Sequence, residues 1–267
     1  MQRPRRRFGQ NFLTDAGTLE RMADTVSPAP GATLLEIGPG RGALTAPLLD
    51  RGAQVIAIEI DRDLAATLRQ WPVAQDGRLT VVEADALACP VTDFRPDSAE
   101  PLRIVGNLPY NLSTPLLFHL TDDRQSVSDL HLLLQREVVE RMAARPGSRI
   151  YGRLSVMLQY RCQVDPLFDV APTCFTPAPQ VTSAFVRLRP HPTPPIPSVN
   201  ERCLADIVAQ AFGQRRKTLR NALSTLLDAT AIEAAGIDPN DRAERIDLAG
   251  FGRLARALDT HTHPPEA

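Results

Sequence analysis

Five short apolar segments, separated by stretches with helical periodicity, constrain the fold of this chain more than any other feature of its sequence. They are Thr33–Ile37, Gln54–Ile60, Leu79–Glu83, Leu102–Gly106 and Asp129–Leu134. Each has the length and continuous hydrophobicity of a strand buried on both faces. Leu44–Asp50 and Leu64–Trp71, which lie between successive segments, are typical of crossover helices. The alternation predicts βαβ units and an α/β fold with a mostly parallel sheet.

Two further strands are predicted downstream, at Val164–Val170 and Ser183–Leu188, with the proline-rich segment Ala171–Pro179 between them. Short connections join antiparallel strands, because parallel strands need a long crossover. We therefore expect a sheet of seven strands with an antiparallel pair at one edge.

A domain boundary is expected where prolines cluster. Pro190, Pro192, Pro194, Pro195 and Pro197 fall within eight residues and predict a stiff connector. The predicted division is a first domain at 1–190, a linker at 191–197 and a second domain at 198–267.

Helical periodicity dominates the predicted second domain. Ser198 and Glu201 match a capping box before the first amphipathic pattern, which runs through Leu204, Ile207, Val208, Ala211 and Phe212. A second pattern spans 219–227, and Asp247 is placed to cap a third helix that carries Leu248, Phe251, Leu254 and Leu258. The second domain is therefore predicted to be a small bundle of helices.

Charge and cysteine content exclude several classes of protein. Among 267 residues, 30 basic and 31 acidic side chains give a net charge of −1, which excludes a simple polycation. No uncharged apolar run approaches the roughly 18 residues of a membrane span. Met1 leads into arginines without an apolar segment behind them, so we expect no secretion signal and a cytoplasmic location. The four cysteines show no C-x-x-C spacing, which argues against a zinc site or a disulfide framework.

The first predicted strand runs directly into Gly38-Pro39-Gly40-Arg41-Gly42. Such a turn is either a tight strand-to-helix connection or the place where a ligand approaches the backbone, and alone it is a weak motif. Glu59, at the end of the second strand, favours a ligand because a carboxylate there can accept hydrogen bonds from both ribose hydroxyls. Asp85 follows the third strand. Ala43 stands where a dinucleotide site would have its third glycine, so an adenosine cofactor without a pyrophosphate fits better.

The fourth strand ends at Asn107-Leu108-Pro109-Tyr110. An exocyclic adenine amine is a poor nucleophile because its lone pair is delocalised into the ring. Two acceptors, the Asn107 side-chain oxygen and the Leu108 carbonyl, can draw the amine toward sp³ geometry. Tyr110 can stack on an extruded base. The alternative is a rigid Asn-Pro turn with a core tyrosine, but the position beside the cofactor slot favours chemistry.

Basic residues cluster in three places. They are Arg3, Arg5, Arg6 and Arg7; six arginines against two glutamates from 136 to 161; and Arg215, Arg216, Lys217 and Arg220. Any one cluster is as consistent with a solvated surface as with a ligand site. Three together favour contacts with nucleic-acid phosphates.

The sequence resembles the ribosomal small-subunit RNA adenine dimethyltransferase family, the KsgA type of class I methyltransferase, over nearly its whole length. The matching stretches are Phe8–Leu13 (FGQNFL), Leu35–Thr45 (LEIGPGRGALT), Glu59–Asp61 (EID), Gly106–Leu117 (GNLPYNLSTPLL), Gln135–Met142 (QREVVERM), Phe175–Ser183 (FTPAPQVTS), Phe212–Leu223 (FGQRRKTLRNAL) and Arg242–Phe251 (RAERIDLAGF). The resemblance implies a Rossmann-like class I methyltransferase domain followed by a helical domain that binds RNA.

What the resemblance implies for the site is specific. The cofactor would be S-adenosylmethionine, contacted by Asn11, Leu13, Gly38, Glu59, Asp85 and Asn107. Tyr110 and Phe175 would sandwich the flipped adenine, although Phe175 on residue type alone is a core aromatic, and Phe12 remains ambiguous between packing and binding. The chemistry would need no metal. The RNA contacts would include Arg5, Arg6, Arg7, Arg215, Arg216, Lys217 and Arg220.

The resulting hypothesis is a monomeric enzyme that dimethylates two adjacent adenines in the 3′-terminal helix of 16S RNA, acting on immature small subunits during their biogenesis. One alternative is a related methyltransferase of large-subunit 23S RNA that confers antibiotic resistance; Gly9, Leu108 and the Arg242–Phe251 stretch favour the small-subunit enzyme. Another is an RNA-binding assembly factor with vestigial catalysis, against which the intact Asn107, Pro109 and Tyr110 argue. A DNA adenine methyltransferase is disfavoured because those enzymes typically begin the tetrapeptide with Asp or Ser.

Overall fold

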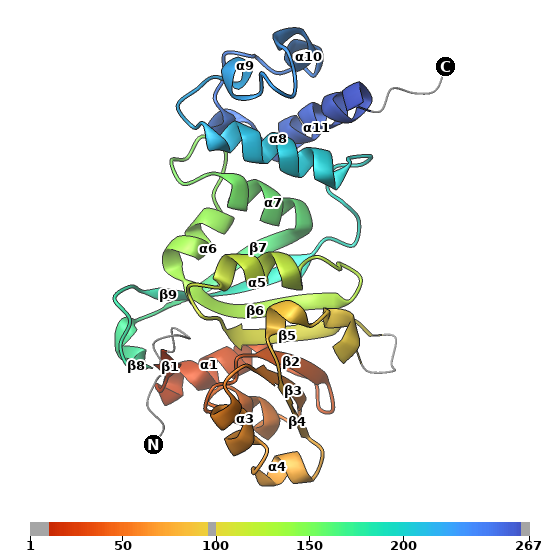
Figure 1. Cartoon of the computed structure of the whole chain (residues 1–267). Coiled ribbons are helices and arrows are strands. Elements are labelled where there is room, and N and C mark those ends of the chain that lie inside the picture. The colour runs from red at the N-terminus through yellow and green to blue at the C-terminus, as the bar shows by residue number, and fades with distance from the viewer. Residues whose placement is uncertain (1–10, 96–99, 263–267) are drawn as a thin grey trace. The chain divides into compact units, whose positions relative to one another are not determined.

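The chain forms two compact units (Figure 1), and the computed structural model describes residues 11–95 and 100–262. The first unit comprises Met1–Val139 and Asp165–Pro190, and the second comprises Glu140–Val164 and His191–Ala267. The sequence-based division placed residues 140–164 in the first domain. In the structure this segment belongs to the second unit, where α7 (Arg153–Arg161) packs against α8 (Glu201–Gly213).

A seven-stranded sheet forms the centre of the first unit. Its strand order is β4 (Leu79–Glu83), β3 (Gln54–Glu59), β2 (Thr33–Ile37), β5 (Leu102–Asn107), β6 (Val127–Gln135), β9 (Ser183–Pro190) and β7 (Cys162–Val170). The first five strands in this order are parallel to one another, whereas β9 runs antiparallel to β6. The predicted mostly parallel sheet with an antiparallel edge is confirmed.

One detail of the strand prediction is wrong. The segment Leu79–Glu83 was expected to be buried on both faces, but in β4 the side chains of Thr80 and Glu83 are exposed. β4 lies at one edge of the sheet, so it is covered less completely than the central strands.

The helices of the first unit lie before or between the parallel strands. They are α1 (Ala16–Val26), α2 (Thr45–Asp50), α3 (Arg62–Leu68), α4 (Pro72–Gln75) and α5 (Ser113–Leu120), with short 3₁₀ turns at η2 (Ala86–Ala88), η3 (Val91–Phe94) and η4 (Pro172–Cys174). α3 begins two residues before the predicted helix because the Asp61 side chain caps it by accepting from the Asp63 amide. It ends before Trp71, since a residue that precedes proline disfavours helical geometry.

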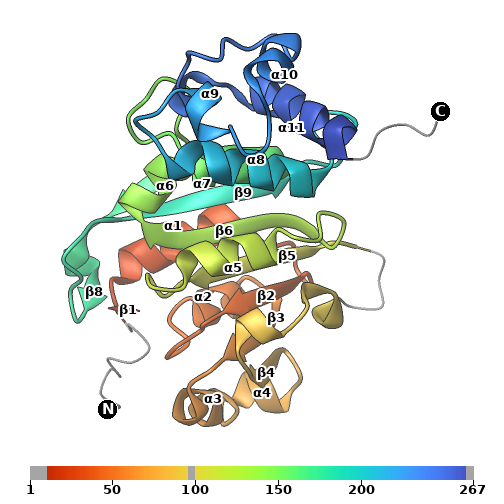
Figure 2. The same cartoon turned by 45° about the horizontal axis from the view of Figure 1, so that its top comes forward.

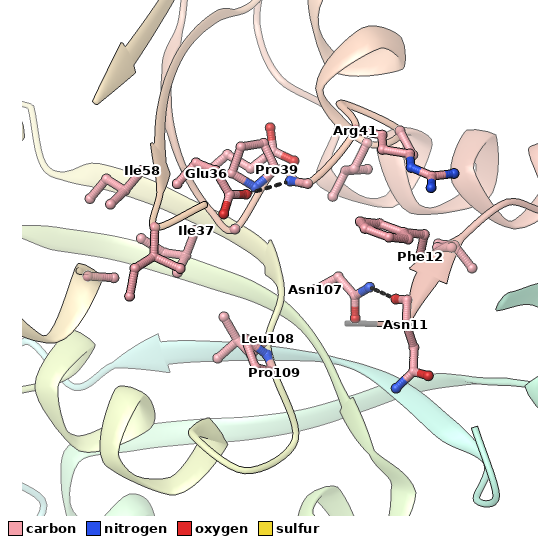
Figure 3. A pocket seen from close by; sticks show the side chains of 18 of the residues that line it. Asn11, Phe12, Glu36, Ile37, Pro39, Arg41, Ile58, Asn107, Leu108 and Pro109 are labelled. Carbon is pink, nitrogen blue, oxygen red and sulfur yellow. Dashed lines mark hydrogen bonds between the residues drawn. The ribbon is translucent and has the colours of Figure 1, made fainter. Parts of the chain in front are cut away.

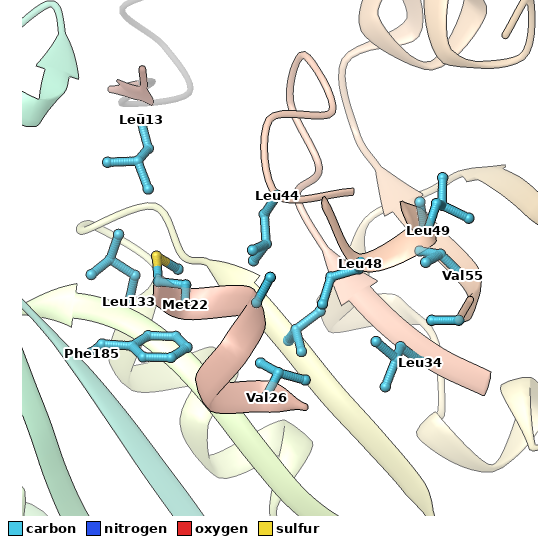
Figure 4. Close-up of a cluster of buried hydrophobic side chains, with 14 of the residues drawn as sticks. Leu13, Met22, Val26, Leu34, Leu44, Leu48, Leu49, Val55, Leu133 and Phe185 are labelled. Carbon is cyan, nitrogen blue, oxygen red and sulfur yellow. The ribbon is translucent and has the colours of Figure 1, made fainter. Parts of the chain in front are cut away.

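Apolar side chains from α1, α2 and one face of the sheet form a common core (Figure 4). Met22 of α1 and Leu48 of α2 meet Leu34 of β2, Val55 of β3 and Phe185 of β9, and each of these five side chains is at most 1% exposed. Burying such a side chain contributes roughly 1.5–3 kcal/mol relative to leaving it in water. This core fixes α1, and with it the segment that precedes α1, against the sheet.

A second, two-stranded sheet joins two distant segments of the first unit. β1 (Phe12–Leu13) pairs antiparallel with β8 (Phe175–Thr176), and the two lie side by side in Figures 1 and 2. The amides of Thr14 and Asp15 both donate to the Cys174 carbonyl, which extends the connection. Two-residue strands are too short to show an alternating pattern, so the sequence did not predict them.

The register of the main sheet brings the predicted site segments to one edge. Ile37 at the end of β2 lies opposite Ile58 of β3 and Gly106 of β5, and Glu59 lies opposite Glu83 of β4. Because the order reverses at β2, the strands that follow it in sequence lie on both of its sides. Ligands of open α/β sheets bind beyond the carboxyl ends of the strands at such a switch point.

The second unit consists of helices and short connecting turns. Besides α7 and α8 it contains α9 (Leu219–Ala222), α10 (Ala229–Ala234), η5 (Ala243–Arg245) and α11 (Leu248–Thr262), and α6 (Arg136–Met142) ends within it. α8 and α11 lie side by side in both views of Figures 1 and 2 and pack through buried apolar faces. The Asp247 carboxylate accepts from the Gly250 amide at 2.7 Å, which confirms the predicted cap. No helix among residues 11–95 and 100–262 is long and apolar enough to cross a membrane.

Two details of the helix prediction for this unit are wrong. Ser198 does not cap α8; it has a positive φ of 54°, and the side-chain oxygen of Asn200 accepts instead from the amides of Arg202 and Cys203. The predicted helix over 219–227 is only the single turn α9. Leu223 and Leu227 are nonetheless buried, so the apolar spacing reflects their packing in turns and not a continuous helix.

Candidate functional site

A pocket of about 340 Å³ opens at the carboxyl edge of the parallel strands. Nine of the residues singled out from the sequence line it together: Asn11, Leu13, Gly38, Glu59, Asp85, Asn107, Leu108, Pro109 and Tyr110. They come from β1 and from the ends of β2, β3, β4 and β5, which the sheet register aligns. The pocket has the size of a small-molecule site.

The glycine-rich turn forms one wall of this pocket and is tied to Glu59. Gly38 and Gly40 have positive φ angles of 67° and 59°, a conformation that strongly favours glycine. The Gly40 amide donates to Glu59 Oε2 at 3.0 Å, and the Asp61 amide donates to Glu59 Oε1 at 2.8 Å. Burial raises the pKa of Glu59, although these two amide hydrogen bonds oppose that rise. A carboxylate has about four acceptor positions, so Glu59 retains capacity for a ligand.

Phe12 covers the turn from the side of β1 (Figure 3). A Cβ atom at Gly40 would lie 3.2 Å from the Phe12 ring, and the Arg41 guanidinium lies 4.3 Å from the centre of that ring. This is the geometry of a cation–π contact. Phe12, which the sequence left ambiguous, therefore packs on the glycine turn and also lines the pocket.

Glu36 and Ile60 are among the pocket residues that the sequence analysis missed. Glu36 in β2 is 2% exposed and accepts from the Thr45 hydroxyl at 2.6 Å. Burial, with a smaller contribution from the charge of Glu59, raises the pKa of Glu36 to about 7. Ile60, directly after Glu59, is 46% exposed and presents an apolar surface to the pocket. Two signals in the sequence could have identified them. Glu36 is an acid within an apolar strand, and Ile60 is an apolar residue just beyond the end of a strand.

The raised pKa of Glu36 predicts a pH-dependent stability. Between its ordinary value of 4.5 and about 7, the folded state holds more protons than the unfolded state, so the free energy of unfolding falls as pH rises through this window. The loss approaches about 3 kcal/mol above pH 7. We expect Glu36→Gln to be more stable than the wild type at pH 8 and to lose most of that advantage near pH 5, as measured by urea unfolding. Glu233→Gln, at an exposed position, is the control, and a pH-independent difference for Glu36→Gln would contradict the assignment.

The Asn107 amide has a defined orientation. Its Nδ2 donates to the Asn11 carbonyl at 3.2 Å, and because a carbonyl can only accept, the other side-chain atom must be the oxygen. Figure 3 shows this oxygen pointing away from Asn11. The backbone of β5 at Gly106, directly before Asn107, is tightly packed, because a Cβ atom at Gly106 would lie 2.7 Å from the Ile37 carbonyl. The end of β5 therefore presents an acceptor to the pocket at a fixed place.

The residues after Asn107 are held by other elements of the first unit. The Leu108 amide donates to the Leu133 carbonyl of β6 at 3.2 Å. The Pro109 carbonyl accepts from the buried Ser113 hydroxyl at 3.0 Å. The Tyr110 hydroxyl is 2.6 Å from Ser183 Oγ at the start of β9. The loop is therefore anchored at every residue.

Phe175 is not brought into the pocket with these residues. It is 3% exposed and belongs to the apolar core together with Leu13, its partner in the pairing of β1 with β8. In this arrangement its ring is not available to a base in the pocket.

The residues expected to bind RNA separate into three groups. Arg5, Arg6 and Arg7 lie outside the described residues. In the second unit Arg216, Lys217 and Arg220 are exposed. Arg215 differs from them because its guanidinium donates to the carbonyls of Arg149 and Tyr151 at 2.8 and 3.0 Å and lies 3.8 Å from Glu244. Arg215 is exposed as well, but its guanidinium is held by hydrogen bonds within the second unit.

Solved structures share this fold. The 23S rRNA methyltransferase ErmE superimposes with a TM-score of 0.71 and is 28% identical, over 93% of this chain and 100% of that one. A dimethyladenosine transferase from Plasmodium falciparum gives a TM-score of 0.77 at 24% identity, over 94% and 98% of the two chains. With its pocket at the switch point of the sheet, the chain has the fold of a class I methyltransferase.

Sequence comparison narrows this class. The model of the family described as ribosomal RNA adenine dimethylase matches residues 1–260, and the chain belongs to this family. It is 53% identical to the ribosomal RNA small subunit methyltransferase A of Methylococcus capsulatus, over 96% of this chain and 98% of that protein. It is 49% identical to the protein of the same name from Photorhabdus laumondii, over 95% and 93% of the two chains.

Proposed function

We propose that this protein dimethylates the N6 amines of two adjacent adenines in the 3′-terminal helix of 16S ribosomal RNA, using S-adenosylmethionine. The observation that carries the proposal is the anchored Asn107–Tyr110 loop, whose amide oxygen and tyrosine ring border the pocket. Relatives that are 49% and 53% identical to this chain are named for the small subunit, whereas the 23S enzyme ErmE is 28% identical. This difference favours the small-subunit substrate.

The pocket residues fit S-adenosylmethionine. Glu59 keeps acceptor positions for ribose hydroxyls after binding two backbone amides, and Ile60 offers an exposed apolar surface for an adenine ring. Gly38 and Gly40 leave the backbone accessible, and the proposed binding residues are completed by Asn11, Leu13, Asp85 and Asn107. When bound, this cofactor supplies an electrophilic methyl group.

The chain's own contribution to catalysis is to orient the target amine. Asn107 Oδ1 and the Leu108 carbonyl are proposed to accept its two N–H groups, which aims the lone pair at the methyl group. Because these acceptors are held in place before the substrate arrives, they need no reorganisation during transfer. Pro109 keeps the turn rigid, and the Tyr110 ring is proposed to stack on the flipped adenine. Phe175 would reach that base only if β8 separated from β1, so we assign stacking in this arrangement to Tyr110 alone.

The substrate assignment is tested by offering two RNAs in parallel. Immature small subunits and protein-free large-subunit RNA are incubated with labelled S-adenosylmethionine, and nucleosides are identified by mass spectrometry. We expect dimethyladenosine in the small-subunit RNA and little label in the large-subunit RNA. The reverse preference would overturn the proposal in favour of a 23S enzyme.

We also propose that the protein acts as a monomer and works in the cytoplasm. In its second unit, the exposed residues Arg216, Lys217 and Arg220 are proposed to bind phosphates of the substrate RNA. RNA affinity is then expected to fall steeply with salt. The charge reversals Arg216→Glu and Lys217→Glu should weaken binding, and each should lower the salt slope by about 1 if it removes one phosphate interaction.

Filter binding over a salt series measures this effect. Arg202→Glu, at an exposed position on α8, is the matched control and should leave the slope unchanged. Arg215→Glu should in addition lower the melting temperature, because it removes two hydrogen bonds to backbone carbonyls. An unchanged slope in the Arg216 and Lys217 variants would refute the phosphate contacts.

A further inference from the structure

The antiparallel direction of β9 brings a buried hydroxyl to the active edge of the sheet. β5 and β6 are parallel and end at the pocket edge, whereas β9 runs the opposite way and begins there. Ser183, the first residue of β9, is paired with Gln135, the last residue of β6. Its position is therefore fixed by the sheet, and its side chain is fully buried.

The hydroxyl of Ser183 reaches Tyr110 on the loop that follows β5. The two oxygens are 2.6 Å apart, although the residues are 73 positions apart in sequence. In the sheet β6 lies between β5 and β9. This hydrogen bond therefore passes over the end of β6 and links the loop after β5 to β9. It holds the hydroxyl at the end of the Tyr110 side chain and therefore limits rotation of the ring.

We propose that Ser183 is a positioning residue for methyl transfer, whose hydroxyl holds the Tyr110 ring in the orientation that stacks on the target adenine. The inference rests on the proposed function. Because the Tyr110 hydroxyl is bound to Ser183, Tyr110 acts on the base through its ring face and not through its oxygen. Burial raises the pKa of Tyr110, so its hydroxyl stays protonated at neutral pH and can take part in this hydrogen bond.

The test removes the hydrogen bond from each side in turn. Ser183→Ala and Tyr110→Phe both delete it and keep the aromatic ring, so each is expected to lower kcat about 10-fold, the rate equivalent of one neutral hydrogen bond. The double variant is expected to lose no more than either single variant, because the same interaction is missing in all three. KM for the small subunit and the dissociation constant for S-adenosylmethionine should stay near their wild-type values.

A spectroscopic measurement separates positioning from general destabilisation. An RNA hairpin with 2-aminopurine at the target position fluoresces less when that base stacks on an aromatic ring, and we expect brighter complexes with Ser183→Ala and with Tyr110→Phe than with wild type. Ser126→Ala is the matched control, since Ser126 is 1% exposed and its hydroxyl binds the Asp123 side chain away from the pocket. It should leave both kcat and fluorescence unchanged.

Wild-type kcat and fluorescence in Ser183→Ala, or losses that multiply in the double variant, would overturn the proposal. If Ser183→Ala does not fold, Tyr110→Phe, at a half-buried position, decides between the outcomes by the same readouts. A wild-type protein that transfers no methyl group to adenine would instead refute the proposed function, so the two failures are distinguishable.

Discussion

Replacing Asn107 by alanine is expected to abolish most methyl transfer while the cofactor still binds. Asn107 Nδ2 is held by the Asn11 carbonyl, and this leaves Oδ1 as the acceptor proposed for the target amine. Alanine removes that acceptor, whose contribution is largest in the transition state, so kcat should fall about 100- to 1,000-fold. Single-turnover transfer to small subunits measures the loss, and calorimetry with S-adenosylmethionine measures what remains of binding.

Asn107→Asp is the informative companion variant. It retains an oxygen that can accept from the amine, but it loses the donor to Asn11 and places a carboxylate beside that carbonyl. We therefore expect its turnover to lie between those of the wild type and Asn107→Ala. Near-normal turnover in Asn107→Ala, or a loss of cofactor affinity as large as the loss of kcat, would contradict the orienting role.

The central sheet could be predicted because its strands are continuous apolar runs. Thr33–Ile37 and Leu79–Glu83 have the predicted bounds, and the antiparallel edge followed from the short connection before Ser183. The helices were harder to delimit from periodicity. In the segment 219–227, buried leucines recur at helical spacing, yet only one helical turn forms. The helical spacing of leucines indicates which side chains are buried. Different backbone conformations can bury the same side chains, so the spacing alone does not establish a helix.

Three residues on the cofactor side of the site could be predicted, because each stands at the end of a strand. Gly38, Glu59 and Asp85 lie at the ends of three successive parallel strands, and parallel strands bring their ends to one edge. Contacts between segments far apart in sequence could not be predicted this way. The hydrogen bond from Asn107 to Asn11 depends on β1, whose pairing with β8 leaves no periodic signal. The bond from Tyr110 to Ser183 depends on the place of β9 beside β6.

Phe175 and Arg215 show what a motif leaves open about the surroundings of a side chain. Phe175 lies in the core, and Arg215 is bound to two carbonyls of its own unit, although each stands in a stretch that resembles the family. A motif identifies a residue type at a position. Whether the side chain faces a ligand or the protein depends on the neighbours that the fold supplies.

Replacing Glu59 by glutamine is expected to cause the largest loss of cofactor affinity. Each Glu59 oxygen accepts from a backbone amide, one of Gly40 and one of Asp61. Glutamine has one oxygen and one NH₂ group, so one of these amides would face a donor and the glycine turn would lose its anchor. Hydrogen bonds to a charged group are each worth about 1.5–3 kcal/mol, which corresponds to roughly a 10- to 100-fold rise in the dissociation constant for S-adenosylmethionine.

Glu83→Gln is the matched control, because Glu83 lies beside Glu59 in the sheet register but is exposed, paired with Arg69 and outside the pocket lining. It should bind S-adenosylmethionine as the wild type does. The raised pKa of Glu59 adds a second expectation, since protonation removes an acceptor. Wild-type affinity should fall as pH decreases toward that pKa, which lies above 4.5, and the affinity of Glu59→Gln should change less over the same range. Calorimetry across pH measures both, and equal affinities of Glu59→Gln and wild type at neutral pH would show that the carboxylate does not hold the cofactor.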